Sequence, residues 1–349
     1  MGEILGLGIT HQPALVARDV KPLSLRTTLQ DPGLPERLRT PDGWPAPMRE
    51  EWSDDEGAAF GRQHRDAIVA ALRRARQTLD EFRPDFLVVW GDDQYENFQE
   101  DCVPPFCILA YDQVECRPWA SRPPGSNAWD EPPDATFTVR GHRAGAKALA
   151  SGLLAQDFDV AYAYRPLHAT LGHAFLNAVL YLDWDRRGFD YPLVPCAVNA
   201  YGRTLTGTHG YLASLAQPLA ADELDPPSPA PRRCFALGAA CARTLAASPW
   251  RVALVASSSW SHAFLTRKHY YLYPDHAADR ALYTALRDGD YDAWRNYSLA
   301  AVEESGQHEL LSWFCLAGAM AELGRRPDDI AYFESYTMNS NKVVATFRP

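Results

Sequence analysis

The sequence predicts an α/β fold in which helices cover both faces of one mixed β-sheet. Short apolar runs of strand length recur along the chain, and segments with apolar residues at helical spacing lie between them. Several of these runs are apolar nearly throughout, which is typical of strands covered on both faces, so we expect the sheet to be mostly buried. No internal repeat at solenoid spacing interrupts the alternation, and we therefore expect residues 1–349 to form a single domain with proline-rich loop insertions.

Apolar runs mark the expected strands, and helical periodicity marks the expected helices. Strands are expected at Ile4–Ile9, Phe86–Trp90, Phe106–Ala110, Val160–Tyr164, Leu193–Val198 and Val252–Ser257. Helices are expected at Ala58–Phe82, Ala144–Leu154, Leu171–Leu182, Arg233–Ala247, Ala277–Arg287 and His308–Leu323. Because proline removes a backbone donor and fixes φ, we expect loops or lids at three proline-rich stretches, Pro22–Pro47, Pro118–Pro133 and Pro218–Pro231.

Composition and charge exclude several classes of protein. The chain has 34 Lys and Arg against 44 Asp and Glu, and it is 46% hydrophobic and 22% charged, which is typical of a globular protein. The formal net charge of −10 and the lack of any Lys/Arg-rich run mean that the chain should repel a phosphate backbone, so we expect no nucleic-acid partner. No apolar run approaches the ~20 residues of a membrane span, so we expect no membrane partner.

Cysteine usage and the N-terminal stretch favour a cytoplasmic protein. None of the seven cysteines forms a CxxC pair, and the odd count argues against a closed disulfide framework. The first residues lack a basic region, and Thr10, His11 and Gln12 interrupt their apolar run, so this stretch does not resemble a signal peptide. We also expect a homo-oligomer.

Polar residues that directly follow apolar strands are the first candidates for chemistry, because ligands of open α/β sheets bind beyond the carboxyl ends of the strands. The candidates in this sequence are His11, Asp92, Asp93, Gln94, His262 and, in the first turn of the last helix, Glu309. Each also has a structural interpretation as a hydrogen-bonding histidine, a turn or N-cap residue, or a helix-terminal charge. Together they suit a facial metal site for O2 chemistry, which uses two histidines and one carboxylate and leaves positions open.

The candidates lie in five segments that follow one another in the order GITHQPAL, FLVVWGDDQYENF, LGHAFLNAVLYL with YPLVPCAVNAYG, VALVASSSWSHAFL and HELLSWFCLAGAM. In this order the segments resemble the class III extradiol ring-cleavage dioxygenases, the superfamily of the protocatechuate 4,5-dioxygenase catalytic subunit. The resemblance implies an α/β domain around a mostly buried mixed sheet. It also implies that His11 and Glu309 bind the metal. His262 would be the catalytic acid-base histidine, and His173 a histidine of the substrate pocket.

The sequence departs from the family pattern at the second metal-binding histidine. That residue usually follows the strand found here at Phe86–Trp90, but the chain has no histidine between His64 and His142. Asp93 or Gln94 could coordinate the metal instead, or a different histidine could reach across. His64 is the nearest in sequence, although its surroundings favour a place on the first long helix.

The resemblance implies a non-haem Fe(II) dioxygenase that cleaves a catechol-like or aminophenol-like aromatic ring with O2. An extra oxygen ligand in place of an imidazole would make the site harder and would favour Mn(II), Mg(II) or Zn(II) more than usual. This shift motivates an alternative, a metal-dependent hydrolase or lyase on the same fold. A non-catalytic subunit that has lost a ligand is a third hypothesis, which the presence of His11, His262 and Glu309 disfavours.

Overall fold

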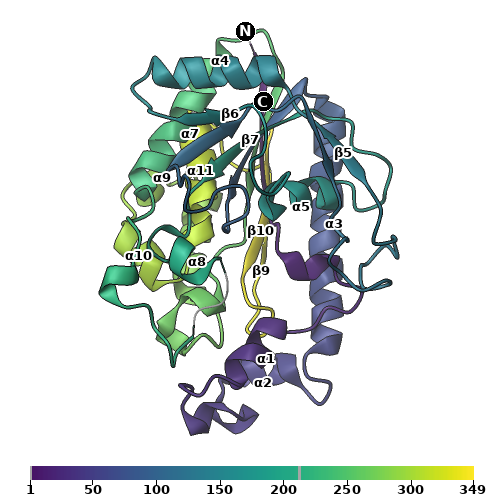
Figure 1. Ribbon diagram of the computed structural model, residues 1–349, viewed down its shortest axis with the longest axis vertical. Helices are drawn as coiled ribbons and strands as arrows, with labels where there is room; N and C mark the ends of the chain where they lie inside the picture. The colour runs from purple at the N-terminus through teal and green to yellow at the C-terminus, as the bar shows by residue number, and fades with distance from the viewer. Residues whose placement is uncertain (1, 211–213) are drawn as a thin grey trace.

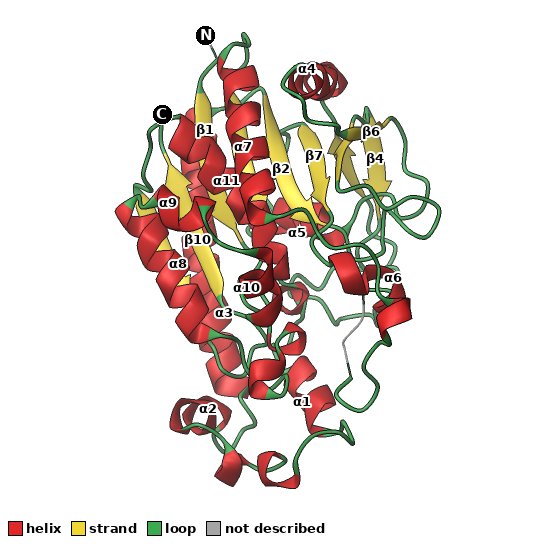
Figure 2. Ribbon diagram, turned by 90° about the vertical axis from the view of Figure 1, so that its left-hand side faces the viewer, coloured by secondary structure: helices red, strands yellow, loops and turns green. Residues whose placement is uncertain are grey.

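The computed structural model describes residues 2–210 and 214–349, and it confirms the predicted α/β class. Eight strands form one mixed sheet in the order β6-β3-β7-β2-β8-β1-β10-β9 (Figures 1 and 2). The strands of this sheet are β1 (Ile4–Ile9), β2 (Phe86–Asp92), β3 (Phe106–Leu109), β6 (Ala161–Ala163), β7 (Leu193–Val198), β8 (Val252–Ser257), β9 (Asp329–Phe333) and β10 (Lys342–Phe347). A separate antiparallel pair consists of β4 (Gln113–Cys116) and β5 (Phe137–Arg140).

The centre of the sheet is parallel. β8 lies between β1 and β2 and runs parallel to both, and β7 runs parallel to β2 on its other side. Antiparallel neighbours occur toward the margins, where β3 pairs with β7, and β10 pairs with β1 and β9. The carboxyl ends of four parallel strands therefore meet at one edge of the sheet.

Helices cover both faces of the sheet, as the sequence predicts. The helices are α1 (Leu23–Leu29), α2 (Ala46–Trp52), α3 (Ala58–Phe82), α4 (Arg143–Leu154), α5 (His173–Leu182), α6 (Leu205–Thr208), α7 (Pro231–Ala246), α8 (His276–Asp288), α9 (Tyr291–Arg295), α10 (Leu299–Glu304) and α11 (Leu311–Glu322). One buried cluster joins α7 and α11 to the sheet, and a second joins α3 and α5 to the opposite face (Figure 1). Alternate residues of β2 enter the two clusters, with Val88 and Trp90 facing α11 and Leu87 and Val89 facing α3.

Helices α7 and α11 approach each other through glycine. A Cβ atom placed on Gly238 of α7 would lie 1.7 Å from the carbonyl oxygen of Cys315, and one placed on Gly318 of α11 would lie 1.9 Å from that of Phe235. No other residue could occupy either position without separating the helices. Because α11 directly follows the segment that carries Glu309, this contact also fixes the position of that side chain.

Several elements differ from the sequence-based expectation. The six predicted strands and six predicted helices are all present with shifts of a few residues, but the sequence did not predict β4, β5, β9 or β10, nor α1, α2, α6, α9 or α10. The expectation of loops at Pro22–Pro47 is wrong in part, because α1 follows Pro22 and α2 begins at Ala46. In both cases proline stands at the helix start, where its fixed φ and missing N–H are tolerated.

Two further features concern the cysteines and the length of the helices. All seven cysteines are free thiols. Within the described ranges, no helix combines the length and the apolar character that a membrane crossing requires.

Candidate metal and catalytic site

The candidate site lies at the carboxyl edge of the parallel strands. His11 follows β1, Asp92 ends β2, and His262 follows β8. Glu309 lies in a short 3-10 helix, His308–Leu310, that leads directly into α11. All four side chains are almost fully buried, with exposed fractions of 3% or less. The structure therefore brings His11, His262 and Glu309 together, as the sequence predicts, from strands and helices distant in the chain.

His11 presents one imidazole nitrogen to two carboxylates. Its Nδ1 lies 2.8 Å from the carbonyl oxygen of Ser257, so this nitrogen carries the proton and donates it. Its Nε2 lies 3.4 Å from Asp92 Oδ1 and 3.3 Å from Glu309 Oε2. Burial lowers the pKa of His11, but the carboxylates of Asp92 and Glu309 outweigh burial and raise it. Because Nδ1 donates to Ser257, Nε2 is the nitrogen that the neutral ring would offer to a cation between these carboxylates, in place of the proton that they favour.

Glu309 has one hydrogen-bonded oxygen and one free oxygen. Tyr201 Oη donates to Oε1 at 2.8 Å, Gln94 Nε2 donates to it at 3.1 Å, and His262 Nε2 lies 3.3 Å away. Burial tends to raise the pKa of Glu309, but His262 and His11 lower it well below its usual range. The free oxygen, Oε2, is the one that faces His11.

Two neighbouring carboxylates at the end of β2 have different roles. One accepts backbone hydrogen bonds within the turn, and the other faces the site. Asp93 accepts hydrogen bonds from the backbone N–H groups of Glu96, Asn97 and Phe98 at 2.8–3.2 Å, so its carboxylate closes the turn. Asp92 faces His11 and accepts from Gln94 Nε2 at 3.1 Å through Oδ2. Burial and the neighbouring Glu309 raise the pKa of Asp92 to about 7.

The sequence analysis selected Asp93 or Gln94 as the replacement for the usual histidine. The structure places Asp92, rather than Asp93, beside His11. Gln94 lies between the two carboxylates and donates to both Asp92 and Glu309. Its amide N–H therefore orients the carboxylates, and the geometry favours Asp92 as the oxygen ligand.

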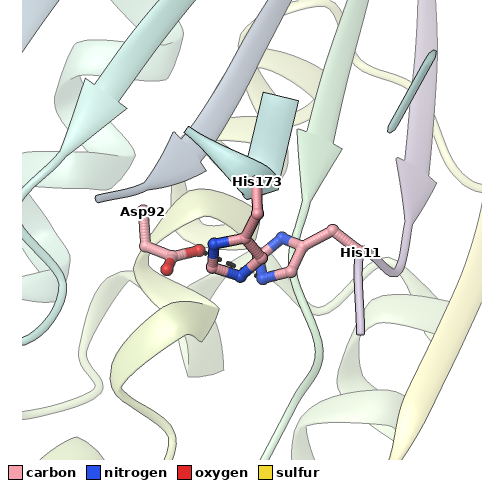
Figure 3. Close-up of side chains that lie close together, drawn as sticks. All are labelled: His11, Asp92 and His173. Carbon is pink, nitrogen blue, oxygen red and sulfur yellow. Dashed lines mark ion pairs between the residues drawn. The ribbon is translucent and has the colours of Figure 1, made fainter. Parts of the chain in front are cut away.

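His173 also reaches the site, from the first residue of α5. The ring of His173 is perpendicular to that of His11, with centroids 4.9 Å apart, and one potential ligand atom from each of His11, Asp92 and His173 lies within 4.8 Å of the others (Figure 3). His64 remains in α3, where its ring stacks on Phe60. The helical interpretation of His64 is confirmed.

Two contributors were missed by the sequence analysis. Tyr201 contacts Glu309, and Glu96 pairs with His173 at 2.8 Å. Tyr201 follows β7, so the rule that polar residues after strands form the site would have found it. Glu96 lies within the turn after β2, and no spacing pattern distinguishes it there from an exposed loop residue.

Buried atoms without hydrogen-bond partners show what the site can hold. Among the described residues, Asp92 Oδ1, Glu309 Oε2 and His173 Nε2 are buried and have no partner. More than nine-tenths of buried polar groups in proteins are hydrogen-bonded, so three such atoms on residues that surround His11 are unusual. Two carboxylate oxygens and imidazole nitrogens fit a divalent transition-metal ion.

A cavity of about 330 Å³ opens beside these residues. Its lining includes His262, Gln94 and Glu309 of the site, together with Phe264, Arg122 and Lys21. Leu23 and Ser24 of α1 also line it, so α1, which lies beyond the sheet edge in Figure 1, helps to enclose the cavity. Its volume suits a small aromatic molecule.

Comparisons with known proteins agree with the dioxygenase part of the resemblance. No family model matches the chain. The chain is 30% identical over 200 residues to a protein of Burkholderia vietnamiensis named 2,3-dihydroxyphenylpropionate/2,3-dihydroxicinnamic acid 1,2-dioxygenase. The match covers 56% of this chain and 50% of that protein. A protein of the same name from Comamonas testosteroni is 30% identical over 200 residues, which is 56% of this chain and 49% of that protein. One from Paraburkholderia phymatum is 31% identical over 200 residues, which is 56% of this chain and 50% of that protein.

The chain thus spans about half the length of the curated relatives it matches. The names of these relatives support a relationship to ring-cleaving dioxygenases in general, and they do not specify the protocatechuate 4,5-dioxygenase subfamily.

Proposed function

We propose that this chain is a metal-dependent dioxygenase that cleaves a catechol-like or aminophenol-like aromatic ring with O2. The observation that carries the proposal is the meeting of His11 Nε2 with the partnerless oxygens of Glu309 and Asp92 at the sheet edge, beside a cavity of substrate size. The names of the relatives support the same class of reaction. A bound Fe(II) would bring two adjacent substrate heteroatoms and O2 together at one centre.

His262 is the proposed proton carrier. Its Nδ1 is buried without a partner among the described residues, its Nε2 faces Glu309, and the residue lines the cavity. Burial lowers the pKa of His262, and Glu309 opposes this effect only in part. The imidazole is therefore neutral near pH 7 and can accept a proton from a substrate hydroxyl.

The cavity wall suits an aromatic substrate that also carries an anionic group. Arg122, whose guanidinium lies 6.0 Å from the centre of the Trp119 ring, and Lys21 contribute positive charge to the wall. Asp19 and Glu309 contribute negative charge. Arginine binds carboxylates in a bidentate geometry. The relatives are named for a catechol that bears a propionate or a related acid side chain, and we propose a substrate of this kind for this chain.

Metal reconstitution followed by O2-uptake measurements tests the proposed function. The metal-free chain is loaded with Fe(II), Mn(II) or Zn(II) and offered catechol, 2-aminophenol and 2,3-dihydroxyphenylpropionate. Uptake of one O2 per ring opened, with a lower KM for the acid than for catechol, is the expected result. In Arg122→Met the KM for the acid should rise about 10-fold or more, because a charge-assisted pair is worth ~1.5–3 kcal/mol, while the KM for catechol stays the same.

Other outcomes would contradict the proposal. Hydrolysis of an ester or cleavage of a C–C bond without O2 uptake would favour the alternative of a metal-dependent hydrolase or lyase. Metal binding without turnover of any ring substrate would favour the non-catalytic subunit.

A further inference from the structure

The hydrogen bonds of His173 fix both its orientation and its tautomer. Its Nδ1 lies 2.8 Å from Glu96 Oε2, and its backbone N–H donates to both oxygens of the same carboxylate at 3.0 and 3.1 Å. The preceding Gly172 donates its N–H to Asn97 Oδ1 at 2.7 Å, which anchors the start of α5 on the turn after β2. Because a carboxylate accepts hydrogen bonds, Nδ1 carries a proton, and Nε2 is the nitrogen that can offer a lone pair when the ring is neutral. Burial lowers the pKa of His173, but Glu96 outweighs burial and raises it to about 10, so a cation would have to displace the Nε2 proton.

This second nitrogen points into the cluster of site residues. His173 Nε2 is buried and has no partner among the described residues, and the rings of His173 and His11 and the carboxylate of Asp92 converge from α5, β1 and β2 (Figure 3). A histidine that donates one N–H to a carboxylate and presents the other nitrogen to a site is the usual arrangement of a metal-binding imidazole. In this role Glu96 is the positioning residue.

Two carboxylate oxygens beside His11 Nε2 also lack a hydrogen-bond partner. Asp92 Oδ1 and Glu309 Oε2 are both partnerless, and each lies within 3.4 Å of His11 Nε2. The second oxygen of each carboxylate is held by Gln94, which leaves the free oxygens pointing toward the imidazoles. Two carboxylates neutralise a divalent ion, which reduces the cost of burying its charge.

We propose that the chain holds its divalent ion with four side chains, His11, Asp92, His173 and Glu309. In this arrangement Asp92 and His173 together take the place of the missing second histidine. His262 is not part of the set, because it contacts the hydrogen-bonded oxygen of Glu309 rather than the free one. The proposal deepens the proposed function at its metal site, but it does not depend on ring cleavage.

Four protein ligands have a chemical consequence. Four protein side chains would leave an ion fewer positions for substrate and O2 than a facial triad does. Glu96 would keep the ring of His173 in place with or without the ion.

Pulsed EPR of the full chain loaded with one equivalent of Cu(II) counts the bound imidazoles through their remote nitrogens. We expect two imidazoles in the wild type and in His262→Gln, and one in His173→Gln. His168→Gln is the matched control, since His168 lies five residues earlier and pairs with Asp101 at 2.8 Å outside the cluster. Competition with a chelating dye should show Mn(II) affinity about 100-fold weaker in His173→Gln and 10- to 100-fold weaker in Glu96→Gln, with no change in His168→Gln.

Two imidazoles in His173→Gln, or one imidazole in the wild type, would overturn the proposal, as would unchanged Mn(II) affinity in His173→Gln. The spectra of the wild type and His262→Gln together decide the question even if that variant does not fold. Because neither measurement uses O2 or an aromatic substrate, a chain with two imidazoles and no O2 uptake would refute ring cleavage alone.

Discussion

Replacing Tyr201 with Phe tests whether Glu309 must be held in place to bind a metal ion. Tyr201 Oη donates to Glu309 Oε1 at 2.8 Å, and both side chains are at most 2% exposed. Phenylalanine keeps the ring and its packing, so the substitution removes one hydrogen bond and creates no large cavity. A hydrogen bond to a charged group contributes ~1.5–3 kcal/mol, and ~1.4 kcal/mol corresponds to a factor of ten in affinity.

We therefore expect Tyr201→Phe to weaken Mn(II) binding by about 10- to 100-fold, the range typical of residues that orient metal ligands. The assay is competition with a chelating dye at fixed pH, together with urea denaturation of the metal-free chain. Tyr291→Phe is the matched control, because Tyr291 Oη donates at 2.6 Å to the carbonyl oxygen of Arg325, outside the site. Equal Mn(II) affinity in Tyr201→Phe and wild type would refute the reasoning, and so would an equal loss in Tyr291→Phe.

Three further predictions concern helix packing, a buried lysine and proton transfer. Gly238→Ala should lower the free energy of unfolding, measured in urea, by about 1–3 kcal/mol, because the new Cβ would lie 1.7 Å from the Cys315 carbonyl oxygen. A variant as stable as the wild type would contradict this close contact. Burial lowers the pKa of Lys342 to about 7, so between pH 7 and ~10 the folded chain binds fewer protons than the unfolded chain and its stability rises with pH. The stability of Lys342→Met relative to wild type should accordingly fall by on the order of 4 kcal/mol from pH 7 to 10, and a pH-independent difference in urea unfolding would refute a low pKa. His262→Ala should keep its metal but react ~10²–10⁴-fold more slowly in single-turnover kinetics, and either a wild-type rate or loss of the metal would exclude its role in proton transfer.

The parallel core of the fold could be predicted because its strands are covered on both faces. β1, β2, β7 and β8 are apolar along nearly their whole length, and each was recognised from that pattern. β10 was missed, although it is also fully buried, because it begins with Lys342 and lies in a segment with no flanking helix pattern. The burial of Lys342 depends on carbonyl oxygens of residues 338 and 340, which accept its hydrogen bonds and which no local pattern identifies.

The edge of the sheet at which the site lies could be predicted, but the assignment within the turn after β2 could not. The apolar run ends at Trp90, whereas β2 continues to Asp92. Side chains alternate along a strand, so Asp92 takes the same face as Trp90, the face that carries α11 and Glu309. Asp93 falls outside the strand and accepts backbone hydrogen bonds in the turn. The predicted end of the strand fell two residues short, which is why Asp93 was predicted as a ligand while the structure places Asp92 beside His11.

The proposed ligands come from widely separated parts of the chain, since His11 follows the first strand and Glu309 precedes the last helix of the sequence. The proposed metal site would therefore be complete only after β1 and β2 have joined the sheet and both α5 and α11 have packed against it. An ion that binds the folded chain alone would stabilise it by ~4 kcal/mol at a free concentration 1,000 times its Kd. The concentration of the metal ion would thus affect the yield of folded protein as well as its activity. The number of ions bound per chain would then measure the fraction of molecules that are folded.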